Sequence, residues 1–181
     1  GGAQAAIFSY SDFSSIAGLT LNGDAAQAGN LLRLVPSTDT QAGTAFYNTP
    51  LALSAGTSFS TTFSFNVTTN PDGGGAPDGF SFILQTLGAT ALGAGGQGLG
   101  YVGLSPSVAV AFRGRDPSFI GVIAGGTDPA NLPTPFSPAG AATGLAEGAF
   151  YGQDEYAWID YSAGTLDVYL SATDGKPGTA T

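Results

Sequence analysis

Residues 58–67 alternate between two kinds of side chain with a period of two. One set is Phe59, Thr61, Phe63, Phe65 and Val67, and the other is Ser60, Thr62, Ser64 and Asn66. Because successive side chains of a strand point to opposite faces, the alternation predicts an extended strand with one face in a core and one polar face. The chain must therefore supply a second layer that covers the apolar face.

Similar short runs recur along the chain and are separated by Gly, Pro and Asn. The further strands that we expect cover residues 6–10, 19–21, 31–35, 43–47, 80–85, 108–113, 119–123, 156–161 and 166–170. Short strands at this spacing, with turn signals between them, favour an antiparallel β-sandwich. We find no internal repeat and no convincing helix, and we expect one domain over residues 1–181, with a flexible arm at residues 1–5.

Residues 107–124 read as the central hairpin of this sandwich. Val108, Val110 and Phe112 share one face of the first strand, and Ala109, Ala111 and Arg113 share the other. A short polar loop, residues 114–118, leads to a second apolar run. Two strands alone are marginally stable, so the hairpin must lie inside a larger sheet.

The charge of the chain excludes some classes of partner. Four Lys and Arg residues oppose thirteen Asp and Glu residues, which gives a net charge of −9 over 181 residues. Such a surface repels phosphate backbones and anionic lipids, so we expect neither a nucleic acid nor a membrane surface as partner. No apolar run reaches the roughly 20 residues that a transmembrane helix needs, so we expect no membrane insertion.

Three residue types are missing: the chain contains no Cys, no His and no Met. Without Cys there is neither a disulfide framework nor a thiol site. A translated chain starts with Met, so we expect Gly1 to be a processed terminus. Removal of a signal peptide is the simplest cause, which predicts a secreted, extracellular or cell-surface protein.

Several segments together resemble the legume-type (L-type) lectin family, especially its secreted bacterial members. The matching residues are 8–15, 19, 22–24, 31–34, 42–47, 59–65, 78–82, 99–101, 108–110, 120–122, 157–161 and 166–170. The resemblance implies a concanavalin-type jelly roll, with a flat back sheet, a curved front sheet and a sugar site in loops above the concave face. The family's terminal strands have no counterpart after Lys176-Pro177.

The resemblance also implies carbohydrate-binding residues. Asp78 matches the family's sugar-binding Asp, whose carboxylate can accept two strong hydrogen bonds from adjacent hydroxyls. Gly96 and Gly98 are the nearest matches to a glycine that offers a backbone N–H. The surrounding loop, residues 88–100, is either a flexible spacer or a surface for close ligand approach. Asp116 matches a ligand position of the family's metal loop and completes the candidate carbohydrate-binding set.

The metal-binding loop of the family is eroded in this chain. The family's strand reads Val-Ala-Val-Glu-Phe-Asp, and its two metal-ligating acids correspond here to Ala111 and Arg113. The family's metal-ligating His corresponds to Phe119. Calcium takes six to eight oxygen ligands, so one carboxylate, Asp116, beside guanidinium groups does not provide a site. We predict no metal and no other cofactor, with Arg113 or Arg115 substituting for the metal by pairing with Asp116 or Asp78.

Three aromatic side chains, Tyr156, Trp158 and Tyr161, either belong to the core or stack on sugar faces. An enzyme is not expected, because no His or Cys supplies a familiar nucleophile–base pair. The only glutamates, Glu147 and Glu155, do not form the paired acids of a glycosidase.

Two functions remain open from the sequence. The first is a secreted, metal-independent carbohydrate-binding module whose partners are glycans. The second is a structural subunit of an extracellular matrix or filament, in which identical chains pair strands at an exposed sheet edge.

Overall fold

The computed structural model describes residues 7–54, 56–68, 77–115, 118–129, 142–143 and 148–181. Within these ranges the chain forms eleven strands and one short 3-10 helix. The strands are β1 (Leu19–Gly23), β2 (Ala26–Ala28), β3 (Leu31–Arg33), β4 (Gly43–Tyr47), β5 (Phe59–Asn66), β6 (Gly79–Gln85), β7 (Ser107–Arg113), β8 (Phe119–Ala124), β9 (Ala142–Thr143), β10 (Asp154–Ser162) and β11 (Thr165–Ser171), and the helix is η1 (Gly96–Gly98). No described helix is long and apolar enough to cross a membrane.

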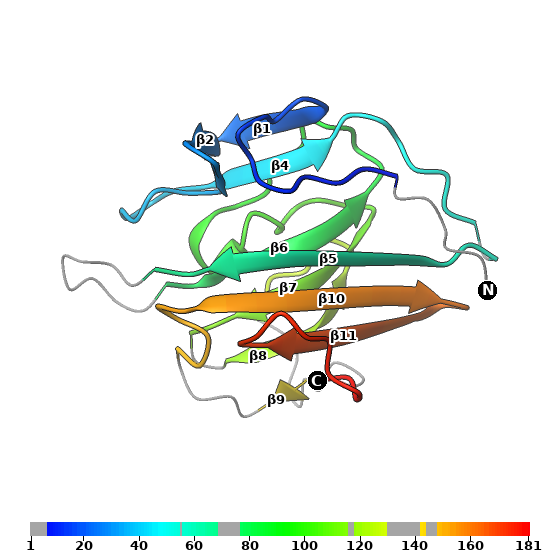
Figure 1. Cartoon of the computed structure of the whole chain (residues 1–181). Coiled ribbons are helices and arrows are strands. Elements are labelled where there is room, and N and C mark those ends of the chain that lie inside the picture. Colours follow the sequence, from blue (N-terminus) through cyan, green and yellow to red (C-terminus); the bar gives the residue numbers. More distant parts are fainter. Residues whose placement is uncertain (1–6, 55, 69–76, 116–117, 130–141, 144–147) are drawn as a thin grey trace.

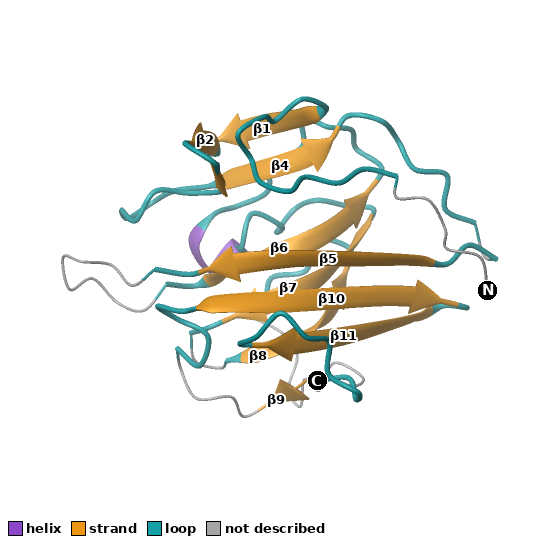
Figure 2. Cartoon of the chain, in the orientation of Figure 1, coloured by secondary structure: helices purple, strands orange, loops and turns teal. Residues whose placement is uncertain are grey.

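The strands form two layers, as Figure 1 and Figure 2 show. In the front layer β5, β10 and β11 pair in the order β11-β10-β5, and behind it β6 to β9 pair in the order β6-β7-β8-β9. Two smaller pairs, β1-β4 and β2-β3, lie beyond the free edge of β5. Every pairing between these strands is antiparallel. The predicted all-β antiparallel sandwich is therefore confirmed.

The predicted hairpin at residues 107–124 is present, and the strands expected at residues 156–161 and 166–170 form a second hairpin. Strands β7 and β8 pair from Val108 with Ala124 to Arg113 with Phe119. Strands β10 and β11 are joined by a two-residue loop in which Ala163 and Gly164 have φ angles of 50° and 87°. Two consecutive residues at positive φ give the backbone twist that tight hairpins prefer.

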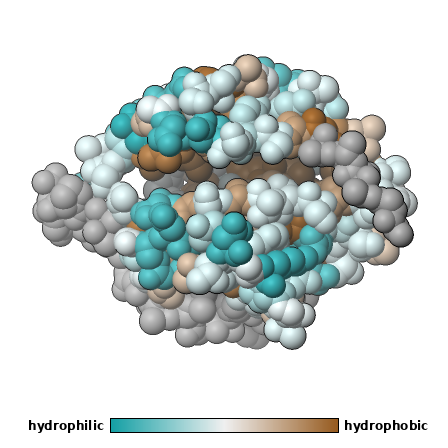
Figure 3. Space-filling model, in the orientation of Figure 1, coloured by the Kyte–Doolittle hydropathy of each residue, from teal (hydrophilic) through white to brown (hydrophobic). Residues whose placement is uncertain are grey.

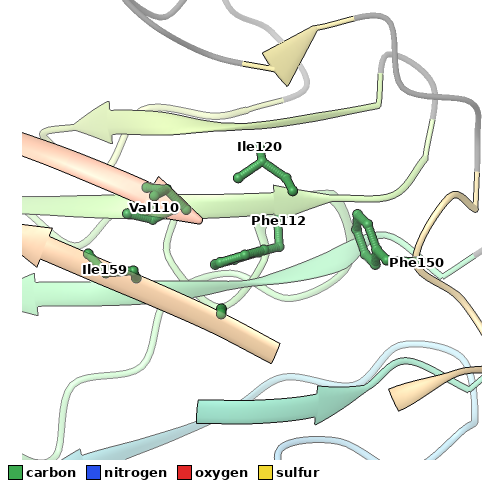
Figure 4. Close-up of a cluster of buried hydrophobic side chains, with 7 residues drawn as sticks. Val110, Phe112, Ile120, Phe150 and Ile159 are labelled. Carbon is green, nitrogen blue, oxygen red and sulfur yellow. The ribbon is translucent and has the colours of Figure 1, made fainter. Parts of the chain in front are cut away.

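The main core lies between the two layers (Figure 4). Its buried members are Val110, Phe112, Ile120, Phe150, Ala157, Ile159 and Val168. Phe63 and Phe65 from β5 pack against this cluster, which is the role that their alternation predicts. The apolar faces of the strands therefore meet inside the sandwich, and this burial is the dominant favourable term for the fold.

A second cluster covers the opposite face of β7 and β8. It contains Leu99, Tyr101, Ala109, Ala111, Phe119 and Ile123. Leu99 belongs to the glycine-rich segment and Tyr101 follows it directly, so the end of this segment packs against the sheet as part of the structure. The spacer interpretation of residues 88–100 is therefore wrong for its second half.

The N-terminal strand expected at residues 6–10 is not formed in its described part, residues 7–10. Side chains hold this segment instead: the Tyr10 hydroxyl donates to the Ala17 carbonyl at 2.6 Å, and Phe8 stacks on Tyr47 with ring centroids 4.3 Å apart. Ile7 and Phe8 are exposed, and no described strand pairs with this segment. The local pattern could not show that a ladder partner is missing among the described residues. The short strands β2 and β9 were not expected.

Figure 3 shows a hollow lined by hydrophobic side chains between the β1–β4 pair and β5. It lies along the edge of β5 that faces away from β10, and β5 is the last strand of its sheet. The predicted arm at residues 1–5 and much of the loop between β8 and β10 lie outside the described residues. The single domain over residues 1–181 stays a prediction.

Candidate functional site

Asp78 stands directly before β6, at the end of the sheet where β7 ends. The next residue, Gly79, pairs with Arg113 and has a φ of 122°. An added Cβ at Gly79 would lie 2.0 Å from the Phe112 carbonyl oxygen, so only glycine fits here. The Gly114 N–H donates to the Asp78 carbonyl at 3.1 Å and fixes the backbone of Asp78 against the end of β7.

The glycine-rich segment forms a tight loop over this end of the sheet. The Gly93 N–H donates to the Gly100 carbonyl at 3.0 Å, and the Gly100 N–H donates to the Ala94 carbonyl at 2.8 Å. An added Cβ at Gly95 would lie 2.2 Å from the Gln41 carbonyl oxygen. The loop is therefore packed closely on residues 40–42, which the sequence places about fifty positions away.

The structure brings Asp78 and Gly96 together. An added Cβ at Gly96 would lie 3.6 Å from Asp78 Oδ2, which is an ordinary van der Waals distance. Gly98 is buried one turn further on, and its N–H already donates to the Gly95 carbonyl at 3.0 Å. Asp116 lies outside the described residues.

A cavity of about 290 Å³ opens beside Gly96. It is lined by Thr40, Gln41, Ala42, Gly95 and Gly96. Thr40 has a φ of 63°, which is an outlier for a β-branched residue. Strained backbone of this kind concentrates at functional sites. Residues 40–42 were missed by our sequence reasoning, because they reach the site only through contact with Gly95.

The charge next to Asp78 is supplied by Arg115. Its Nη1 atom lies 3.7 Å from Asp78 Oδ1, and the two side chains are 45% and 21% exposed. Of the pairings expected between Arg113 or Arg115 and the two acids, the described residues contain the one between Arg115 and Asp78. At this exposure the ion pair contributes little to global stability.

The described residues do not fit a divalent cation. No group of three or more His, Cys, Asp or Glu comes together in the described parts of the chain. Arg113, which stands where the family resemblance implies an acid, is only 2% exposed. Calcium needs six to eight oxygen ligands, and a guanidinium offers none.

The remaining sequence candidates lie elsewhere. Tyr156 and Trp158 stack at 6.4 Å between ring centroids, on the face of β10 opposite to the buried Ala157 and Ile159. The core interpretation is therefore wrong for Tyr156 and Trp158, whereas Tyr161 is on the inner face and stacks on Phe59. Glu155 is buried and accepts a hydrogen bond from Gln153, and Glu147 lies outside the described residues.

Comparison with known proteins gives one family and one fold. The model of the legume lectin domain matches residues 5–112. A lectin from Bauhinia forficata in complex with GalNAc is 22% identical, with a TM-score of 0.70 over 93% of this chain and 78% of that one. The metal-free form of lectin I-B4 from Griffonia simplicifolia is 25% identical, with a TM-score of 0.66 over 91% and 78%.

A third neighbour is the VIP36 exoplasmic/lumenal domain in a Ca²⁺/Man-bound form. It is 16% identical, with a TM-score of 0.61 over 92% of this chain and 69% of that one. These likenesses agree with the observed two-layer arrangement of antiparallel strands. The family match covers more than half of the chain, from the N-terminal segment to the end of β7. The chain belongs to the legume lectin domain family.

Proposed function

We propose that this protein is a carbohydrate-binding lectin that takes its glycan beside Asp78 without a metal ion. The observation that carries the proposal is the proximity of Asp78 Oδ2 to Gly96, which is one of the residues that line a cavity of about 290 Å³. Family membership supports the general role, because legume lectin domains bind sugars. The particular residues are our assignment.

In this assignment Asp78 Oδ2, which lies beside Gly96, accepts hydrogen bonds from sugar hydroxyls, because Oδ1 is buried. Ionised acceptors form shorter and stronger hydrogen bonds than neutral ones. Gly96 contributes its backbone N–H as a donor to the sugar. Gly98 supports the loop from inside, and Asp116 remains a candidate whose position is outside the described residues.

The lining of the cavity suits a sugar ring better than a charged ligand. Ala42, Gly95 and Gly96 present small surfaces, and Thr40 and Gln41 add a hydroxyl and an amide. The Gln41 side chain donates to the Asp39 carbonyl at 3.0 Å, which orients its amide. Two of the solved neighbours are complexes with GalNAc and with Man, which makes neutral or N-acetylated hexoses the first ligands to test.

The proposal includes a location and a lineage. We infer a secreted protein of the extracellular space or cell surface, related to the bacterial members of the family. The solved VIP36 neighbour is an exoplasmic/lumenal domain, which agrees with a place in the secretory pathway. The family and neighbours are lectins rather than enzymes, and we propose no catalytic activity.

A glycan array followed by calorimetric titration of the strongest sugar tests this function. Asp78→Asn removes the charge but keeps the shape, and it should weaken binding by about 1.5–3 kcal/mol, the cost of a hydrogen bond to a charged group. Asp174→Asn, at an exposed position in the C-terminal segment, is the matched control and should change nothing. Equal affinities for the wild type and Asp78→Asn would refute the assignment.

The alternative function is assembly with identical chains through strand pairing. One observation favours it: β5 ends its sheet, and the edge facing away from β10 pairs with no other described strand. The comparisons do not favour it, because they give a family of sugar-binding proteins. Sedimentation velocity over a range of concentrations distinguishes the two, since assembly predicts oligomers and the lectin proposal does not require them.

A further inference from the structure

The two carboxylate oxygens of Asp78 have different surroundings. Oδ2 faces Gly96, next to the cavity. Oδ1 is buried and has no hydrogen-bond partner among the described residues, and Arg115 Nη1 lies 3.7 Å from it. We propose that Arg115 is a positioning residue that holds Asp78 ready for sugar binding. This inference rests on the proposed function.

A buried carboxylate oxygen needs a compensating charge. Removing an ionised group from water is costly unless the group is paired or hydrogen-bonded. The guanidinium of Arg115 is always charged and carries five N–H donors, so it can supply both. The present separation of 3.7 Å is that of an ion pair and is too long for a hydrogen bond. A small movement would close it to a charge-assisted bond while leaving Oδ2 free for the sugar.

The backbone ties Arg115 to Asp78 from the neighbouring residue. Gly114 donates to the Asp78 carbonyl at 3.1 Å and accepts from the Gly148 N–H at 2.9 Å. An added Cβ at Gly114 would lie 2.2 Å from the Tyr151 hydroxyl oxygen, and that hydroxyl donates to the Pro77 carbonyl. Gly114 is therefore enclosed by groups that also hold residues 77–78. The backbone next to Arg115 is therefore held beside Asp78, whose carboxylate Arg115 would orient.

The local charges oppose a metal ion at the same place. Arg113 is opposite Gly79 in the ladder and is buried, and Arg115 is two residues further along. Like charges at such short range repel more strongly near a protein surface than in water. The VIP36 neighbour is known in Ca²⁺-bound and in metal-free forms. In this chain the positive charge beside Asp78 would come from the Arg115 guanidinium, which a chelator cannot remove.

The test compares Arg115→Gln with Arg33→Gln, each in the full chain. Both variants remove one positive charge, but Arg33 is exposed in β3 and pairs with Ala26, in a strand pair separate from the sheet that β6 belongs to. Titration with the sugar identified on the array should show about 3- to 5-fold weaker binding for Arg115→Gln, in line with an exposed ion pair. Arg33→Gln should bind as the wild type does, and Arg115→Lys should recover part of the loss.

Two further readouts separate positioning from general stability. Wild-type affinity should be the same in EDTA and in millimolar CaCl₂. The Gly96 amide resonance in a ¹H–¹⁵N spectrum should shift in Arg115→Gln and not in Arg33→Gln, while the melting temperatures of both variants stay close together.

Each outcome decides the proposal. Unchanged sugar affinity and an unchanged Gly96 resonance in Arg115→Gln would overturn it, as would an affinity that depends on Ca²⁺. If Asp78→Asn itself leaves binding unchanged, the proposed sugar site is wrong. In that case the Gly96 resonance alone still decides whether Arg115 orients the carboxylate.

Discussion

Strands β7 and β5 contain similar apolar residues but are buried very differently. In β7 every residue from Ala109 to Arg113 is buried, whereas β5 alternates between half-buried and exposed residues along its whole length. Strand β7 has a neighbour at each edge and a cluster of side chains on each face. Strand β5 has one paired edge, to β10, and one covered face.

This difference shows which part of the sheet supports the candidate site. Asp78 and Gly114 flank the ends of β6 and β7, where the backbone is fixed from several sides. The free edge of β5 faces the hydrophobic hollow of Figure 3. The candidate sugar site is therefore built on the rigid half of the sandwich, as a binding site requires if its donors and acceptors are to be preorganised.

The largest expected effect is on the free energy of unfolding, when one aromatic ring is truncated in β7 and, in a separate variant, one in β5. Phe112→Ala should destabilise the protein by about 3–5 kcal/mol, because the ring is fully buried and its loss leaves a cavity. Phe63→Ala should cost about 2 kcal/mol, because Phe63 is only partly buried against the same cluster. Urea unfolding measures both free energies of unfolding, with one common dependence of free energy on urea concentration for the two variants. Equal costs would show that the β5 edge is covered in solution.

A smaller effect is expected where the glycine-rich loop covers β7. In Gly95→Ala the new methyl group would meet the Gln41 carbonyl oxygen at 2.2 Å, so the loop must move away from residues 40–42. Overpacking of this kind costs about 1–3 kcal/mol, and the cavity beside Gly96 should lose its shape. Sugar titration and thermal melting of the variant measure the two consequences separately.

The matched control is Gly175→Ala, where an added methyl group would meet nothing within 4 Å. It should leave both the affinity and the melting temperature unchanged. If Gly95→Ala were stable but bound sugar as tightly as the wild type, residues 40–42 would not line the glycan site.

Much of the fold follows from local pattern. Alternation in β5 and the tight turn at Ala163-Gly164 are properties of neighbouring residues, so they can be read from the sequence. Burial on the second face of β7 could not be read from the sequence, because it depends on Leu99 and Tyr101 packing across the sheet. The failure at residues 7–10 has the same origin, since a strand needs a partner that no local pattern reveals.

The candidate site was predictable only in part. The resemblance pointed to Asp78 and Gly96, and the structure brings these two together. It could not choose between Arg113 and Arg115 as the partner of an acid, because the choice depends on how the end of β7 turns. Thr40 and Gln41 carry no motif, and only the close approach of Gly95 brings them to the site.

The smallest expected effect is on the outer side of β10 and β11, where Lys176 pairs with Asp160. The Lys176 ammonium also lies 4.1 Å from the centroid of the Tyr169 ring. Burial pushes the pKa of Asp160 upward, but hydrogen bonds with Lys176 and Ser60 and the lysine charge outweigh it, so the pKa falls below 3.8. The hydrogen bond with Asp160 raises the pKa of Lys176 above 10.5.

These two shifts define a pH window for the ion pair. A lowered acid pKa gives stability that is lost as pH falls through the pKa of folded Asp160, and a raised lysine pKa gives stability that is lost as pH rises through that of folded Lys176. Lys176→Gln should therefore lower the melting temperature, by less than about 2 °C, only between the two pKa values. Arg33→Gln, with the same charge change, should not reproduce this profile. A Lys176→Gln deficit that persists well below pH 3.8 would mean that the side chain acts through its packing on Tyr169 and not through Asp160.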